Sequence, residues 1–225
     1  MPTSSGSASW PGGAPRPPAD PSAVAVSGVT GKTIVIASAH HRDRVVREVA
    51  PRLRSMGAVV VVEVVAADRA VDDMRGLAIE LAAREPRIDV LALVGTRRGF
   101  DSAVVQPYLL TRLLADRLAA SRGRVLWSVD GTHRTTTFDP DARRGTHQLA
   151  RALLVHEWPR RDKRIGIASF DPDAATLVQL CGSDERLRGG HFVHGVRVAD
   201  APATTDAELA SRLWGRCAAQ CRLEP

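Results

Sequence analysis

The chain has 225 residues, of which 44% are hydrophobic, so it can bury the core of one domain of ordinary size. Its three cysteines are too few and too irregularly spaced for a disulfide framework or a zinc knuckle. The net charge of +6 is carried almost wholly by arginines scattered among acids, with only 4% aromatic residues, which argues against a nucleic-acid-binding surface.

No apolar run approaches the length needed to span a bilayer, and the first residues lack the basic-then-apolar order of a secretory signal. We therefore expect a cytoplasmic protein with reduced cysteines and no membrane or nucleic-acid partner.

In chain order, residues 1–28 are rich in Pro, Gly, Ser and Ala without periodicity, which predicts a disordered tail. Residues 29–225 then form one domain in which short apolar runs alternate with amphipathic stretches, the βαβ rhythm of a parallel sheet covered on both faces. The predicted strands are 33–37, 58–65, 89–94, 124–128 and 165–170. The predicted helices are 43–56, 71–84, 107–121 and 142–158.

Local signals refine the helices. Pro107 suits a first helical position, whereas Pro51 lies inside the first helix and should kink it. Thr205 and Glu208 have the spacing of a capping box that opens a last helix running to Cys221. The fold class predicted is an α/β, Rossmann-like, doubly wound parallel sheet with helices on both faces.

Six segments, taken in order, resemble the landmarks of the short-chain dehydrogenase/reductase family, and of its retinol-dehydrogenase-like branch in particular. They are GKTIVIASAHHRDR, EPRIDVLALVG, VVQPYLLTRLLADRLAASRGRVLWSVDGTH, THQLARALLVHEWPRR, GIASFDP and TDAELASRLW. The resemblance covers most of residues 31–216. It implies a chain shorter than a typical member, with material missing after the second strand and after Asp173.

The turn that holds the NAD(P) diphosphate in the family reads T-G-x-x-x-G-x-G, because glycine lets backbone amides approach the phosphates. The matching positions for the three glycines carry Ser38, Arg42 and Arg44. Side chains there should fill the cofactor's space, and Asp43 adds like-charge repulsion, so we expect no cofactor. The alternative is that Arg42 and Arg44, with His40 and His41, bind a phosphate themselves.

The family's catalytic set is also replaced. The tyrosine position is Arg144, the lysine position is Gln148, and the serine position is Asp130, or Ser128 if the strand end shifts by two. The asparagine position is Ala103, and the adenosine-flanking N-N-A-G stretch reads Leu93, Val94, Gly95. Neither Arg144 nor Gln148 can donate and recover a proton near neutral pH. The resemblance therefore implies a degenerate member without hydride chemistry.

Polar groups nevertheless remain on the former active-site floor. The candidate catalytic residues are Asp130, His133, Arg144, His147 and Gln148, with Tyr108 nearby. A carboxylate beside an imidazole can move protons, and an arginine can stabilise an enolate. The competing interpretation makes Asp130 a loop cap, the histidines polar residues at a rim, and Arg144 a solvated charge. His191 and His194 lack a third ligand, so no metal site is predicted.

Two functions remain open as main hypotheses. One is a cofactor-independent lyase, cyclase or isomerase that acts on a small carbonyl compound by dehydration, isomerisation or Michael-type cyclisation, as in polyketide and other specialised-metabolite biosynthesis. The other is a catalytically silent relative that serves as a dimer partner or scaffold. An NAD(P)H enzyme with an unusual turn and a basic regulatory binder are further alternatives. The apolar stripes of helices 107–121 and 142–158 predict contacts with the core and with a second subunit, and the resemblance implies a homodimer because these helices form the interface in the family.

Overall fold

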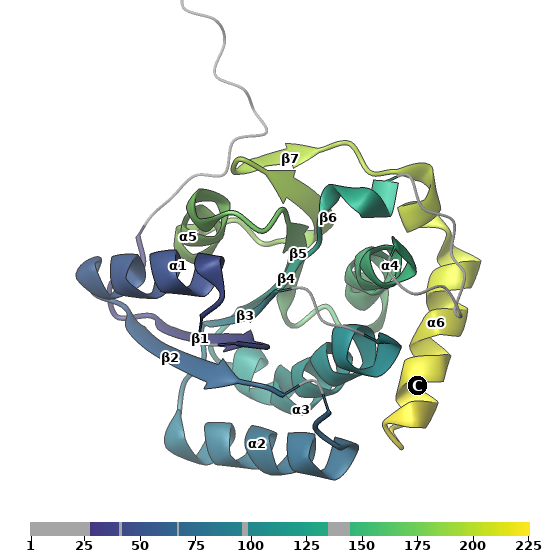
Figure 1. Ribbon diagram of the computed structural model, residues 1–225, viewed down its shortest axis with the longest axis horizontal. Helices are drawn as coiled ribbons and strands as arrows, with labels where there is room; N and C mark the ends of the chain where they lie inside the picture. The colour runs from purple at the N-terminus through teal and green to yellow at the C-terminus, as the bar shows by residue number, and fades with distance from the viewer. Residues whose placement is uncertain (1–27, 41, 67, 96–98, 135–144) are drawn as a thin grey trace, which may run out of the picture.

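The computed structural model describes residues 28–40, 42–66, 68–95, 99–134 and 145–225 (Figure 1). These residues form a seven-stranded sheet in the order β2-β1-β3-β4-β5-β6-β7. The strands are β1 (Thr33–Ser38), β2 (Val59–Val64), β3 (Val90–Val94), β4 (Arg124–Ser128), β5 (Gly166–Phe170), β6 (Arg188–Val193) and β7 (Val196–Val198). All neighbouring pairs are parallel except β6 with β7, which is antiparallel.

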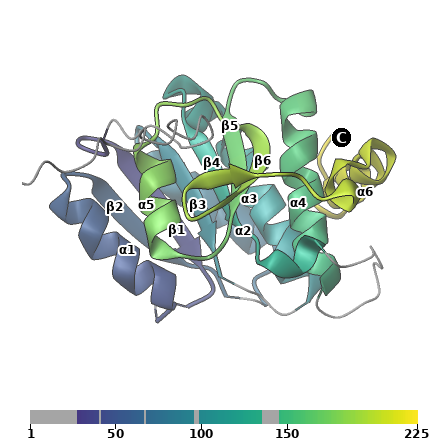
Figure 2. The same cartoon turned by 90° about the horizontal axis from the view of Figure 1, so that it is seen from above.

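Helices cover both faces of the sheet (Figure 2). They are α1 (Arg44–Ser55), α2 (Val71–Arg84), α3 (Gln106–Ala120), α4 (Gly145–Arg161), α5 (Ala174–Gly182) and α6 (Ala207–Gln220). A π-helical turn, η1 (Asp101–Val105), precedes α3, and two 3-10 turns are η2 (Gly131–Arg134) and η3 (Pro202–Thr205). Helices α1 and α5 pack on one face and α2, α3 and α4 on the other, with α6 outside α3 and α4.

The strands alternate between two hydrophobic cores. In β1, Val35 and Ala37 join the core under α2, α3 and α4, whereas Ile34 and Ile36 join the core under α1 and α5. Successive side chains point to opposite faces of a strand, so a strand covered on both faces must be apolar throughout. This explains why the apolar runs of the sequence locate the strands, and the predicted fold class is confirmed.

The start of α6 differs from the prediction. The N-cap is Asp206, whose Oδ1 accepts a hydrogen bond from the backbone N of Leu209 at 2.9 Å. Thr205 instead ends η3, and its hydroxyl donates to the carbonyl oxygen of Pro202 at 2.9 Å. The predicted capping box at Thr205 is therefore wrong by one residue, because an unpredicted 3-10 turn uses the threonine hydroxyl.

Among the described residues, the helix α5 and the strands β6 and β7 have no counterpart among the predicted helices and strands. The strands β6 and β7 are short, with six and three residues. In such short runs the periodicity of apolar residues does not distinguish a strand from a helix. At the other end, β2 is the edge of the sheet, and 53% of the surface of Val59 and 41% of that of Val64 are exposed. The edge strand β2 has the sequence VVVVEV, so it leaves valine side chains exposed at the edge of the sheet.

The apolar stripes of α3 and α4 are buried within the chain itself. Trp214 of α6 packs edge-on against Tyr108 of α3 and Trp158 of α4, with ring centroids 5.0 and 4.9 Å apart. Because α6 covers these faces, the predicted homodimer would have to use other residues of the two helices, and it stays a prediction.

Two further sequence expectations concern the redox state and the membrane. Cys181, Cys217 and Cys221 are buried thiols without a disulfide. Within the described ranges, none of the helices combines the length and the apolar character that crossing a bilayer requires.

Candidate functional site

The turn between β1 and α1 lies where the strand order changes direction, between β1 and β3, the point at which doubly wound sheets bind ligands. Ser38 ends β1 and is fully buried, and its hydroxyl donates to the carbonyl oxygen of His40 at 3.2 Å. His40, Arg42 and Arg44 are exposed. Arg44 Nε donates to Glu48 Oε1 at 2.9 Å on the outside of α1, and His41 lies outside the described residues.

Asp43 holds the first turn of α1. Its Oδ1 accepts a hydrogen bond from the backbone N of Val45 at 2.9 Å, so it is the N-cap of the helix. Its Oδ2 faces Gly95 at the end of β3, since a Cβ added to Gly95 would lie 2.9 Å from that oxygen. The carboxylate therefore sits at the positive end of α1, between the carboxyl ends of β1 and β3.

A dinucleotide cofactor does not fit this turn. Its diphosphate would need the amides at the start of α1 and the space beside Gly95. The Asp43 carboxylate already accepts from one of those amides and stands against Gly95. Like charge and steric overlap both oppose a diphosphate there.

The end of β3 is fixed by side chains from two neighbouring elements. The backbone N of Gly95 donates to Ser128 Oγ at 3.0 Å, and the carbonyl oxygens of Gly95 and Leu93 accept from Arg151 at 3.2 and 3.1 Å. Arg151 is 2% exposed on α4, and its guanidinium lies 5.7 Å from the ring centroid of Trp127. Sequence reasoning missed Arg151, although a charged residue inside the apolar stripe of a predicted helix was the available signal.

Asp130 and His133 come together in the turn after β4. Asp130 Oδ1 accepts from the backbone N of Thr132 at 3.0 Å and also from the Thr132 hydroxyl, so Asp130 stabilises η2 as a loop cap. The Asp130 carbonyl oxygen lies 2.6 Å from His133 Nδ1. Because a carbonyl only accepts, Nδ1 carries a hydrogen and donates it to this oxygen. The backbone N of Asp130 donates to Gln148 Oε1 at 3.3 Å, which ties the turn to α4.

His147 lies one residue before Gln148 but faces another element. Its ring packs edge-on against Phe100, with centroids 6.0 Å apart, and it is 6% exposed. Burial lowers the pKa of His147 below its usual value, so the ring is neutral at pH 7. Arg144 lies outside the described residues.

Tyr108 is in the helical layer instead. Its ring packs against Trp158 and Trp214, and Arg112 Nη1 donates to its hydroxyl at 2.7 Å. Burial raises the pKa of Tyr108 to about 12. These contacts make Tyr108 a packing residue between α3, α4 and α6.

His133 has a further neighbour that sequence reasoning did not place in the site. Its ring contacts that of His191 on β6, with centroids 4.6 Å apart and planes at 65°. The sequence signal was His191 itself, considered only as half of a metal pair with His194. Across the ranges that the structure describes, no group of three or more ligating side chains could hold a metal ion.

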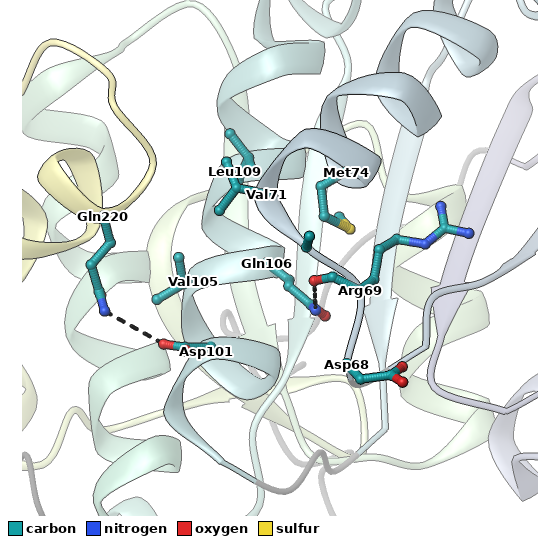
Figure 3. Close-up of a pocket in the computed structure, with 10 residues that line it drawn as sticks. Asp68, Arg69, Val71, Met74, Asp101, Val105, Gln106, Leu109 and Gln220 are labelled. Carbon is teal, nitrogen blue, oxygen red and sulfur yellow. Dashed lines mark hydrogen bonds between the residues drawn. The ribbon is translucent and has the colours of Figure 1, made fainter.

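A cavity of about 390 Å³ opens between the starts of α2 and α3 and the end of α6 (Figure 3). Val71, Met74 and Leu109 form its apolar wall. Its polar rim is internally bonded, since Gln106 Nε2 donates to the carbonyl oxygen of Arg69 at 2.8 Å. The lining contains none of the candidate catalytic residues, so the cavity is separate from the site at the ends of β4 and β6.

Comparison with known proteins gives a match in structure only. No family model matches the sequence, and no curated protein does. A short-chain dehydrogenase from Shigella flexneri superposes with a TM-score of 0.64 at 13% identity, over 75% of this chain and 92% of that chain. A putative short-chain dehydrogenase from Escherichia coli CFT073 gives 0.63 at 15% identity, over 75% and 97%.

A third neighbour, a putative short-chain dehydrogenase from Shigella flexneri 2a strain 301, was crystallised as a complex with NADP. It gives a TM-score of 0.63 at 13% identity, over 75% of this chain and 99% of that chain. At these identities the likeness shows the fold alone. The chain therefore has the short-chain dehydrogenase fold, and the resemblance inferred from the six sequence segments is confirmed at the level of the fold.

Proposed function

We propose that this chain is a cofactor-independent enzyme that uses the short-chain dehydrogenase fold for non-redox acid/base chemistry on a small carbonyl compound. The observation that carries the proposal is the Asp43 carboxylate, which stands between the first turn of α1 and Gly95, where a cofactor's diphosphate would lie. An enzyme that binds no hydride donor can still catalyse reactions that proceed by proton transfer. Dehydration, isomerisation and Michael-type cyclisation are the reactions of this kind on a carbonyl substrate.

Two imidazoles supply the base. The hydrogen bond from His133 Nδ1 to the Asp130 carbonyl oxygen fixes the His133 ring, and burial lowers the pKa of His147, which favours its neutral, proton-accepting form. In a dehydration, the base takes the proton next to the C=O, and the same group then protonates the departing hydroxyl, so that water leaves and no electrons are transferred. Gln148 holds the Asp130 turn, and Arg144 is proposed to stabilise the enolate oxygen.

The substrate class follows from the chemistry of the fold's relatives. Reduction and β-elimination both polarise a C=O group, so a scaffold that has lost hydride transfer can keep its carbonyl substrate. We place the reaction in specialised-metabolite biosynthesis, such as that of polyketides, in the cytoplasm and in a homodimer. No nucleic-acid or membrane partner is proposed.

Burial favours a second candidate, a catalytically silent partner or scaffold. Only 1% of His133 and 6% of His147 are exposed, which leaves little ring surface for a substrate. If no substrate pocket forms beside these two rings, the polar groups at the end of β4 are structural, as Asp130 is in capping η2.

Nucleotide binding and proton exchange test the proposal. Titration with NADPH or NADH, followed by nucleotide fluorescence, is expected to show no saturable binding, and binding at micromolar concentration would contradict it. Deuterium uptake next to the C=O of β-hydroxy ketones, followed by NMR in D₂O, should occur with the dialysed protein. His147→Ala and His133→Gln should slow this uptake, whereas His194→Asn, a change at an exposed histidine, should not. A folded wild-type protein that exchanges nothing supports the silent partner.

A further inference from the structure

A buried group of ionisable side chains lies beyond His133, at the carboxyl ends of β5 and β6. Asp171 follows β5 directly, and His191 on β6 is the register partner of Ser169 on β5. His191 Nδ1 lies 3.1 Å from Ser169 Oγ, and His191 Nε2 lies 3.3 Å from Asp171 Oδ1. A serine, an imidazole and a carboxylate thus follow one another in space, with the ring of His133 packed against the imidazole.

Two atoms of this group lack a hydrogen bond. Asp171 Oδ1 and His191 Nε2 are both fully buried, and their 3.3 Å contact is not aligned for hydrogen bonding. His191 is 3% exposed, so its free nitrogen has no access to solvent through its own surface. Burying an unbonded polar atom carries a free-energy penalty, and native proteins retain few such atoms without a functional reason.

Asp171 connects this buried group to the outside. Its side chain keeps 35% of its surface exposed although Oδ1 is buried beside His191. A substrate at the carboxyl ends of the strands can therefore reach the carboxyl group, whereas the imidazole stays behind it. Ser169 fixes the other side of the ring, since its hydroxyl donates to the carbonyl oxygen of Gly190 at 3.3 Å and can accept from His191 Nδ1.

We propose that Asp171 is the general acid/base of this site and that His191, held by Ser169, is its positioning residue. The inference rests on the proposed function, and it assigns the proton transfer to Asp171 in place of the imidazoles of His133 and His147. The Asp171 carboxylate takes the proton next to the substrate C=O, so that a C–H bond breaks and an O–H bond forms. The electron pair of the resulting enolate expels the β-hydroxyl, which receives the proton from the Asp171 carboxyl group and leaves as water.

The electrostatics of the two groups support proton sharing. Burial raises the pKa of Asp171 and the charges of Asp173 and Asp130 add to this effect, whereas His133 and His194 oppose it. Burial, followed by the charges of His133 and Arg134, lowers the pKa of His191 to about 4. The usual difference in acidity between a carboxylic acid and an imidazolium is therefore narrowed, as an efficient proton exchange requires.

The experiment measures deuterium uptake by 4-hydroxybutan-2-one in D₂O, followed by NMR across a range of pH. Asp171→Asn should lower the rate by about 100-fold or more, the size of a lost general acid/base. Asp206→Asn is the matched control, because it removes the same charge outside the site and an asparagine can still cap α6. It should stay within about twofold of the wild type.

His191→Gln tests the positioning role. It should lower the rate less than Asp171→Asn does and should move the pH at which activity appears, whereas a purely structural residue would change the rate without moving the profile. Asp171→Glu keeps the charge but displaces the carboxyl group. This variant replaces Asp171→Asn as the test of the acid/base role if Asp171→Asn does not fold. A wild-type rate in either Asp171 variant overturns the inference.

The two proposals fail differently. If Asp171→Asn keeps the wild-type rate and His147→Ala loses it, the inference is wrong and the proposed function stands. If the folded wild-type protein exchanges no proton of this ketone, both are wrong.

Discussion

Protonation of His191 should make the protein less stable as the pH falls. The pKa of this imidazole is lowered by burial from 6.5 to about 4, so between these values the unfolded chain binds a proton that the folded chain does not. The contribution of neutral His191 to the free energy of unfolding is therefore fully present above pH 6.5, and it is lost as the pH falls toward 4. At 1.36 kcal/mol per pKa unit, the loss amounts to about 3 kcal/mol, a large part of the 5–15 kcal/mol typical of a domain.

Neighbouring groups modify this loss in known directions. Burial also lowers the pKa of His147 and His156, so both add to the loss of stability as the pH falls. The pKa of Asp171 is raised by burial, and this carboxyl group acts in the opposite sense at the acidic end of the range. The pH dependence of the free energy of unfolding that is due to His191 is therefore obtained as the difference between the wild type and a His191 variant.

Urea unfolding gives that difference. Tryptophan fluorescence reports unfolding, because Trp127, Trp158 and Trp214 are buried, and the measurement is repeated from pH 7.5 to 4.5 at constant ionic strength. His191→Gln should remove most of the loss of about 3 kcal/mol, whereas His194→Asn, at an exposed site, should keep it. An equal loss in His191→Gln and in the wild type would refute the assignment of a buried neutral imidazole.

Two changes test other parts of the structure. Asp43→Ala removes the N-cap of α1 and should cost about 1 kcal/mol in urea unfolding, without creating NADPH binding, because the side chains at the other turn positions remain. Saturable NADPH binding by this variant would show that the carboxylate alone excludes the cofactor. Trp214→Ala removes the ring between Tyr108 and Trp158 and should cost about 3–5 kcal/mol, with faster proteolysis of α6. A cost below about 1 kcal/mol would mean that α6 is not anchored by this ring.

The strands and most helices were predictable because their signal is local. A strand covered on both faces has to be apolar throughout, and the run 124–128 has the same bounds in sequence and structure. The helix predicted at 71–84 likewise appears as α2 with the same bounds. Where a prediction was wrong, as at Thr205, a neighbouring turn had taken the hydroxyl that the pattern assigned to the cap.

The candidate site was predictable only in part. Asp130, His133 and Gln148 come together because the turn after β4 contacts the start of α4, an arrangement that the order of segments implies. Tyr108 follows the same order but lies among α3, α4 and α6, since its position on the helix turns the ring toward Trp214. The spacing of residues along the chain does not predict the direction in which the Tyr108 ring points.

Sequence alone thus determined the layers and the fold, because both depend on residue type and on short-range spacing. The tertiary structure decided which side chains meet: Asp43 with Gly95, and Asp171 with His191. These contacts join residues on different strands and helices, so they are set by strand register and helix packing. A pattern within one segment carries no information about either.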